Sequence, residues 1–150
     1  MTMQPTHVNR DKRFLQSALA IAEIWSKDPS TKVGCIAVGD EPNLVAWGYN
    51  GLPPGIEDTP DRLNNRTQKY ALTLHAETNA LSNAKFPVRT LYVTHHPCLN
   101  CALHILAARS VRRLVYLKGS PEFEARWKES FADSSRVLEE GGIEVVGVAL

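Results

Sequence analysis

Residues 91–117 read LYVTHHPCLNCALHILAARSVRRLVYL, and this stretch decides the class of fold. The pattern predicts an apolar strand over 89–94, a helix over 98–109 and a second strand over 112–117. Two strands joined through a helix pair in parallel by a right-handed crossover. The stretch therefore indicates an α/β protein.

The elements outside this unit alternate in a similar way. The predicted helices lie at 11–26, 74–84 and 120–140, and the predicted strands lie at 33–38, 44–49 and 143–148. The two early strands follow each other through a short turn, so we expect an antiparallel hairpin. The order α-β-β-α-β-α-β-α-β predicts one mixed sheet with helices on both faces.

The 150 residues are expected to form one domain over 11–150, preceded by a flexible arm over 1–10. Residues 50–65 hold three prolines and two glycines with little periodicity, which predicts a long functional or mobile loop. Three kinds of residue are expected to be structural. They are Cys35 in the core, His104 at the surface or beside the metal ligands without binding the ion, and Trp25, Trp47 and Trp127 in the core or in subunit contacts.

The composition, with 43% apolar and 22% charged residues, is that of a globular protein. The net charge of +1 gives no global basic excess, so no nucleic-acid partner is expected. No apolar run approaches the ~20 residues of a membrane-spanning helix, so no membrane partner is expected either. Three cysteines, two of them spaced for a metal, fit a reducing, cytoplasmic compartment better than a disulfide framework.

Two short motifs carry residues that suit a metal ion. The first contains His75 and Glu77, and the second is Pro97-Cys98-Leu99-Asn100-Cys101. One imidazole and two thiols are the three protein ligands of a catalytic zinc site, which leaves a fourth position for water. Cys98 and Cys101 share one face at the start of a helix, where the thiolate is favoured. The paired pattern H-x-E…P-C-x-x-C is the signature of zinc-dependent nucleobase deaminases.

Glu77 follows His75 by two residues, which places it about 200° round a regular helix. It is therefore not expected to bind the same ion, but at the first helical turn it can reach a bound water. Two other interpretations of the cysteines remain. They could form a redox dithiol, or a closed structural zinc site with Cys35, His95 or His96 as the fourth ligand.

At these residues the sequence resembles the cytidine deaminase superfamily and, more narrowly, the deoxycytidylate (dCMP) deaminases. The resemblance extends over 11–148 and rests on SKDPSTKVG at 26–34, GYNGLPPG at 48–55, HAETNAL at 75–81, LYVT at 91–94 and PCLNCA at 97–102. The pair His95-His96 is less usual for the family.

The resemblance implies a three-layer α/β/α cytidine deaminase-like fold with a five-stranded mixed sheet. It also implies a hydrolase that converts dCMP to dUMP and ammonia, supplying dUMP for thymidylate synthesis, with one catalytic Zn²⁺ per chain. Many members are hexamers controlled by dCTP and dTTP, so a homo-oligomer is expected and such effectors are possible partners.

The mechanism expected from these residues uses zinc held by His75, Cys98 and Cys101 to lower the pKa of a water molecule. Glu77 accepts the proton of this water and passes it to the ring N3. Hydroxide adds at C4, and Glu77 then protonates the amino group, which leaves as ammonia.

By resemblance, Asn50 contacts the deoxyribose and the backbone N–H of Ala76 meets the pyrimidine carbonyl. Lys27, Ser30 and Thr31 offer an ammonium and two hydroxyls to the 5′-phosphate, although they could simply finish a helix and a turn. The segment with Gly51, Gly55 and Asp58 is a possible effector loop by resemblance, or else a solvated surface loop.

Other activities of the same fold stay open. A deaminase of dCTP, or of free cytosine or guanine, would share the zinc chemistry. A tRNA adenosine deaminase would require a basic surface, which the net charge does not favour. A zinc-stabilised binding module without catalysis is the alternative from a different class, and Glu77 argues against it.

Overall fold

The computed structural model describes residues 5–150, with side chains from residue 9 onward. Its helices are α1 (Pro5–Trp25), α2 (Pro60–Asn64), α3 (Arg66–Leu72), α4 (Ala76–Asn83), α5 (Leu99–Ala107) and α6 (Pro121–Glu140). Its strands are β1 (Gly34–Val38), β2 (Val45–Tyr49), β3 (Thr90–Val93), β4 (Arg113–Leu117) and β5 (Glu144–Val148).

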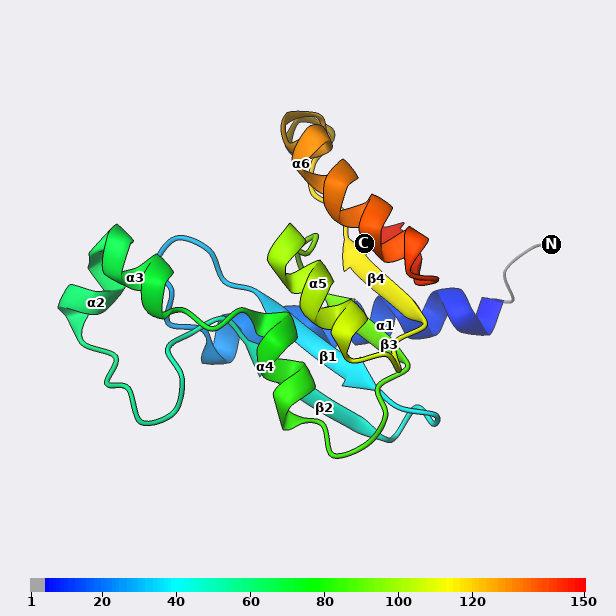
Figure 1. Ribbon diagram of the computed structural model, residues 1–150, viewed down its shortest axis with the longest axis horizontal. Coiled ribbons are helices and arrows are strands. Elements are labelled where there is room, and N and C mark those ends of the chain that lie inside the picture. The colour runs from blue at the N-terminus through cyan, green and yellow to red at the C-terminus, as the bar shows by residue number, and fades with distance from the viewer. Residues whose placement is uncertain (1–4) are drawn as a thin grey trace.

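The strands form one five-stranded sheet in the order β2-β1-β3-β4-β5 (Figure 1). β1 pairs antiparallel with β2 and β3, whereas β3, β4 and β5 run parallel. The expected hairpin and the parallel crossover around 91–117 are both confirmed. The mixed sheet thus joins an antiparallel half to a parallel half at β3.

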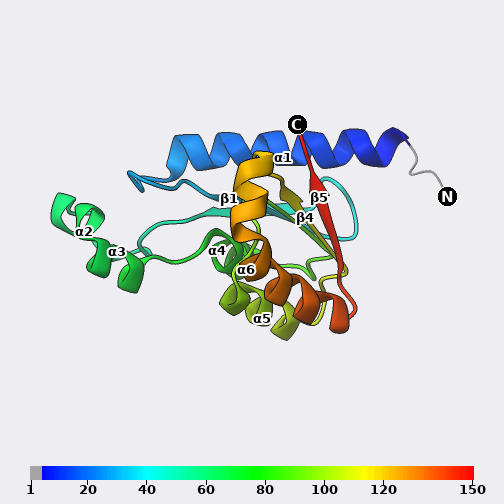
Figure 2. The ribbon, with the colours of Figure 1, turned by 90° about the horizontal axis from the view of Figure 1, so that it is seen from above.

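Helices cover both faces of the sheet and make three layers. Figure 2 shows α1 on one face and α4, α5 and α6 on the other. The core under α1 contains Leu15, Ala18, Ile36, Tyr92 and Val115. The larger core on the opposite face includes Ala76, Ala80, Ala102, Ile105, Leu138, Cys35, Leu91, Val93 and Leu114. The expected place of Cys35 is confirmed, and burial raises the pKa of its thiol.

Two glycines allow helices to approach the sheet closely. A Cβ added to Gly34 would lie 2.1 Å from the carbonyl oxygen of Ala18, and one added to Gly48 would lie 2.4 Å from the nitrogen of Ala80. Any larger residue would push α1 or α4 away from the strand it covers. These glycines therefore help to set the position of α4, whose first turn belongs to the site described below.

The first helix begins earlier than expected. α1 starts at Pro5, so the part of the expected 1–10 arm that the structure describes is helical, and residues 1–4 lie outside the described residues. Pro fits the first helical turn because that turn needs no N–H donor. Asp11 anchors this part of α1, since Arg113 binds it at 2.6 and 2.7 Å and Tyr92 donates to it at 2.8 Å.

The expected structureless loop over 50–65 is wrong in its second half, which forms α2 and leads into α3. Thr59 caps α2 by accepting from the nitrogen of Arg62, and Asn65 caps α3 in the same way through Gln68. The two short helices project from one end of the molecule, away from the sheet (Figures 1 and 2).

The three tryptophans are surface residues. Trp25 is 50% exposed, Trp47 is 40% exposed and Trp127 is 43% exposed, so the prediction of a core position is wrong, while that of subunit contact remains a prediction. The surface position of His104 is confirmed. No helix within residues 5–150 is long and apolar enough to cross a membrane.

Candidate active site

His75 lies just before α4 and caps its N-terminus. The backbone of Leu74 exchanges two hydrogen bonds with Gly51, at 2.8 and 3.1 Å, and this bridge fixes the chain before His75. His75 is extended, with φ −73° and ψ 151°, and its side chain makes no capping hydrogen bond to the helix. The backbone bridge, and not a side-chain bond to the helix, therefore sets the position of His75. Its imidazole is free to act as a ligand.

The two cysteines begin α5, which packs beside α4 (Figure 1). Cys98 is the N-cap, and its Sγ accepts from the nitrogen of Cys101 at 3.4 Å. His75 Nδ1 lies 3.2 Å from Cys101 Sγ and 3.6 Å from Cys98 Sγ. The three ligand atoms all lie within 4.8 Å of one another. The fold thus collects one nitrogen and two sulfurs from two helix N-termini.

The electrostatics of these groups suit a divalent cation. Hydrogen bonds from Cys101 and His75 lower the pKa of the Cys98 thiol to about 3. The hydrogen bond to Cys98, together with burial, raises the pKa of Cys101. The opposite pKa shifts of the two thiols show that they interact closely, and a cation between them would stabilise both as thiolates. A nitrogen and two thiolate sulfurs are ligands that zinc accepts, so the donor set fits this metal.

Glu77 lies against this donor set. It is 5% exposed in the first turn of α4. Burial raises the pKa of Glu77, while a hydrogen bond with Cys101 and the charge of His75 oppose the rise. Because His75 is an extended N-cap, the offset of about 200° calculated for a regular helix does not separate the two side chains. The structure places an acid beside the three ligands but not among them.

The residues expected to hold the sugar and base occupy different environments. Asn50 is buried, and its Oδ1 accepts from Ser26 Oγ at 2.8 Å and from the nitrogen of Val33 at 2.7 Å. Its Nδ2 donates to the carbonyl of Thr31 at 2.8 Å. Asn50 thus braces the loop between α1 and β1. Ala76 is buried at the start of α4, next to His75.

The loop expected to bind phosphate is organised by Asp28. Its Oδ1 accepts from the backbone nitrogens of Ser30 and Thr31, at 2.9 and 3.0 Å, and from the hydroxyl of Ser30. Lys69 of α3 donates to Asp28 at 3.1 Å and to Ser30 Oγ at 2.7 Å. The sequence Asp-Pro-Ser is a turn signal that could have revealed Asp28. No local pattern could have revealed Lys69, which lies 41 residues away.

Lys27 and Asp58 join this loop to the expected effector loop. Their ion pair is 2.9 Å long, and Lys27 is 67% exposed. A cavity of about 180 Å³ lies beside the pair. It is lined by Trp25, Lys27, Asp28, Tyr49, Gly51, Leu52, Asp58, Leu63, Lys69 and Thr73. Gly55 is exposed in a turn with φ +90°, a conformation that favours glycine.

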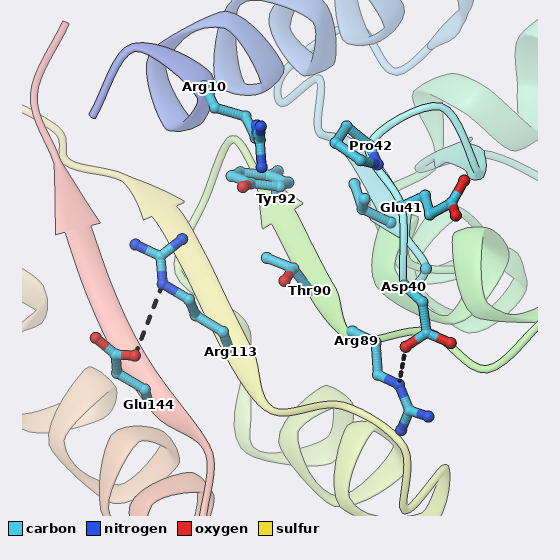
Figure 3. Close-up of a pocket in the computed structure, with 11 residues that line it drawn as sticks. Arg10, Asp40, Glu41, Pro42, Arg89, Thr90, Tyr92, Arg113 and Glu144 are labelled. Atoms are coloured by element: carbon cyan, nitrogen blue, oxygen red, sulfur yellow. Dashed lines mark hydrogen bonds and ion pairs between the residues drawn. The ribbon is translucent and has the colours of Figure 1, made fainter. Parts of the chain in front are cut away.

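A larger cavity of about 480 Å³ lies elsewhere (Figure 3). Its lining includes Thr90, Arg113 and Glu144, the first residues of the parallel strands. The candidate metal ligand Cys98 instead follows the carboxyl end of β3, the edge where open α/β sheets bind substrates. Two ion pairs lie in the lining of the larger cavity, Arg89 with Asp40 at 2.9 Å and Arg113 with Glu144 at 3.7 Å. Because its lining lies at the amino ends of the parallel strands and includes none of His75, Cys98 and Cys101, this cavity is separate from the candidate metal site.

Comparisons with known proteins agree with this geometry. The family model described as the cytidine and deoxycytidylate deaminase zinc-binding region matches residues 8–118. An uncharacterized deaminase of Aliivibrio fischeri, named from the luxG 3′ region, is 37% identical over 141 residues, 93% of each chain. A probable deoxycytidylate deaminase of Caenorhabditis elegans is 32% identical over 136 residues, 87% of this chain and 68% of its own.

A solved structure extends the similarity to the fold. The apo dCMP deaminase of the cyanophage S-TIM5 superposes with a TM-score of 0.70 at 25% identity, covering 97% of this chain and 100% of its own. The chain belongs to the cytidine and deoxycytidylate deaminase family. It is accordingly an α/β enzyme of the cytidine deaminase-like fold, a hydrolase that acts on C–N bonds, with a potential zinc site at His75, Cys98 and Cys101.

Proposed function

We propose that the enzyme hydrolyses dCMP to dUMP and ammonia and so supplies dUMP for thymidylate synthesis. The observation that carries the reaction type is the buried carboxyl of Glu77 beside three zinc ligands from two helix ends. The choice of dCMP is supported by the similarity to deoxycytidylate deaminases over most of the chain.

Glu77 is the group that moves protons in this proposal. A zinc ion held by His75, Cys98 and Cys101 would act as a Lewis acid that makes water a nucleophile at neutral pH. Glu77 accepts a proton from the attacking water and delivers it to N3, which makes C4 more electrophilic. It then takes the remaining proton from the C4 hydroxyl and donates it to the amino group, so that the C4–N bond breaks, ammonia leaves and the C4 carbonyl of dUMP forms. Burial raises the pKa of Glu77, which suits a carboxyl that must both accept and donate.

The base and sugar are assigned to groups near the start of α4. We assign the pyrimidine carbonyl to the backbone N–H of Ala76, because the first N–H groups of a helix have no partner within the helix. We assign the deoxyribose to Asn50, whose Nδ2 carries a second hydrogen beyond the one donated to Thr31.

The phosphate is assigned to Lys27 and Thr31 more than to Ser30. The Ser30 hydroxyl donates to Asp28 and accepts from Lys69, so its bonds are already used within the loop. Lys27 has an exposed partner, Asp58, and exposed ion pairs contribute little, so phosphate can replace the carboxylate at small cost. Lys69 has no such freedom, because it is buried.

A small cavity and a pair of exposed tryptophans bear on effector binding and on assembly of the enzyme. The cavity of about 180 Å³ beside Gly51 and Asp58 supports a dCTP or dTTP effector site in this loop, with Gly55 in its turn. The exposed rings of Trp25 and Trp47, whose centroids lie 5.7 Å apart, support a homo-oligomer through this surface, with a hexamer favoured.

The deciding experiment measures turnover by ultraviolet absorbance with dCMP, dCTP, deoxycytidine, cytosine and guanine. We expect the highest kcat/KM for dCMP. A higher kcat/KM for dCTP or for a free base would show that dCMP is not the preferred substrate, but it would not contradict the zinc chemistry. A sigmoidal dCMP saturation curve that dCTP makes hyperbolic would support the effector site, and an unchanged curve would contradict it.

A further inference from the structure

His96 is a buried polar residue that the proposed reaction does not use. It lies between β3 and the zinc ligand Cys98 and is 5% exposed. Its ring stacks on Phe131 of α6, with centroids 4.5 Å apart and planes at 15°. The ring of Tyr116 packs against the imidazole in a T-shaped arrangement, with centroids 4.6 Å apart. These aromatic contacts hold the imidazole in one orientation.

Both ring nitrogens of His96 have hydrogen-bond partners. Nδ1 lies 3.0 Å from the carbonyl oxygen of Pro97, and Nε2 lies 2.9 Å from Ser135 Oγ on α6. A carbonyl oxygen only accepts, so Nδ1 carries the hydrogen of that bond. Nε2 then carries no hydrogen and accepts from the hydroxyl of Ser135. The imidazole therefore links α6 to the carbonyl of Pro97.

A second residue of α6 binds the same carbonyl. Ser134 Oγ donates to the oxygen of Pro97 at 2.8 Å, and Ser134 is 0% exposed. A carbonyl oxygen has two lone pairs, and here both are used. The carbonyl of Pro97 and the nitrogen of Cys98 belong to one rigid peptide plane. The two donors therefore fix the backbone at the point where the first sulfur ligand leaves it.

The position of that backbone matters for metal binding. Cys98 is the N-cap of α5, with an extended ψ of 167°, so the helix itself does not determine its conformation as it does for Cys101. Metal–ligand distances tolerate only about 0.2 Å of error. A rotation of the Pro97–Cys98 peptide would move Cys98 Sγ relative to His75 Nδ1, from which it lies 3.6 Å away.

We propose that His96 and Ser134 are positioning residues for the zinc site, which hold the Pro97 carbonyl and thereby set the place of Cys98 Sγ. They contact neither the substrate nor the metal, and they act through the peptide plane. The inference depends on the zinc site but not on dCMP, so a different substrate would leave it unaffected.

Two substitutions of His96 separate the hydrogen bond from the packing. His96→Phe keeps an aromatic ring against Phe131 but removes the donor to Pro97. His96→Asn removes the ring but keeps a donor, because its amide nitrogen is as many bonds from Cα as Nδ1. Zinc affinity is measured on the zinc-free protein by competition with a chromophoric chelator. We expect the Phe variant to bind zinc about 10-fold more weakly and the Asn variant to stay closer to wild type.

The Co²⁺-substituted proteins give a second readout, since the d–d and thiolate charge-transfer bands report ligand geometry. The bands should shift in His96→Phe. Equal zinc affinities for the Phe and Asn variants, or weaker binding by the Asn variant, would overturn the proposal.

Ser134→Ala tests the other donor and decides the question if His96→Phe does not fold without zinc. We expect weaker zinc binding in Ser134→Ala, with the unfolding free energy of the zinc-free protein measured alongside. Ser130→Ala is the matched control, because Ser130 is exposed on the same helix. Wild-type zinc affinity in Ser134→Ala would contradict the assignment.

Discussion

His75 and Cys98 each occupy the N-cap of a helix, and His75 Nδ1 lies 3.6 Å from Cys98 Sγ. The positive ends of α4 and α5 therefore converge on the donor set. Each helix end is equivalent to about half a positive charge, which favours the thiolate over the thiol. This convergence explains how two motifs more than twenty residues apart act as one site.

Removal of zinc should lower the thermal stability of the enzyme, and replacing one ligand should abolish the effect of added zinc. Zinc at 100 times its Kd stabilises the folded protein by about 2.7 kcal/mol, provided that the unfolded chain does not bind it. We expect zinc to raise the Tm of the wild type but not of Cys101→Ser. Cys35→Ala is the control, because Cys35 lies in the core. A zinc-dependent Tm in Cys101→Ser would argue against this ligand.

Replacement of Glu77 should separate metal binding from catalysis. Glu77→Ala leaves the three ligands in place but removes the proton carrier, so we expect full zinc content and a loss of about 10³-fold in kcat. Zinc content is measured by metal analysis and kcat by absorbance. Glu23→Ala, an exposed position on α1, should keep normal activity. Near-normal turnover in Glu77→Ala would refute the role of this carboxylate.

Lys69 should be important for stability although it lies in a surface segment. Its side chain is 7% exposed and that of Asp28 is 8% exposed, so loss of one partner leaves a buried charge unpaired. Lys69→Met should lower the unfolding free energy by about 3 kcal/mol in denaturant titrations. The exposed Lys85→Met should change it by less than about 0.5 kcal/mol. If Lys69→Met and Lys85→Met both changed the unfolding free energy by equally small amounts, the Lys69–Asp28 pair would contribute little to stability.

Asp28 should make stability depend on pH in the acid range. Burial raises the pKa of Asp28, but the hydrogen bonds from Thr31, Ser30 and Lys69 outweigh it and leave the pKa below 3.8. A depressed pKa adds stability that is complete above the unfolded value and is lost as the pH falls through the folded value. The difference in unfolding free energy between wild type and Asp28→Asn should therefore be constant near neutral pH and shrink below about pH 4.

The matched control for this pH series is Asp133→Asn. Asp133 is exposed and pairs with Arg136 on the same helix. The unfolding free energy of Asp133→Asn should stay close to that of the wild type at every pH, since exposed ion pairs contribute little to stability. A difference between wild type and Asp28→Asn that does not shrink in acid would contradict the role assigned to the ionised carboxylate.

Lys27 should affect the nucleotide and not the nucleoside. Lys27→Ala is expected to raise KM for dCMP about 10-fold while leaving the kinetics with deoxycytidine unchanged, because only dCMP carries a phosphate. Lys32→Ala provides a control from the same loop, where Lys32 is also exposed. An equal loss for both substrates would show that Lys27 does not contact the phosphate.

The order of the main elements could be read from the sequence because it depends on local pattern. Period-two and period-3.6 apolar spacing predicted the five strands and four of the helices, and the strand–helix–strand unit at 91–117 predicted parallel pairing. The predicted ends of the helices were less accurate. α1 starts at Pro5 rather than Asp11, and Asp11 itself is held by Tyr92 and Arg113, which are far away in the chain.

Other features were missed because their signals are short or nonlocal. The caps Thr59 and Asn65 mark α2 and α3, but these helices span only 5 and 7 residues and lack an apolar repeat. Exposure of Trp47 could not be predicted either, since β2 lies at the edge of the sheet, where no further strand covers it. Trp25 at the end of α1 lies against Trp47 on this same open edge.

The sequence by itself determined the kind of chemistry, because a His-x-Glu and a Cys-x-x-Cys at helix starts predict the candidate ligands and a nearby acid from their spacing. Only the tertiary structure decided how these groups meet. It placed Glu77 against Cys101, joined Lys69 to Asp28 across 41 residues, and fastened the carbonyl before Cys98 to α6. Hydrogen bonds and charge pairs between segments far apart in the chain have no local pattern, so they are decided only when the helices pack on the sheet.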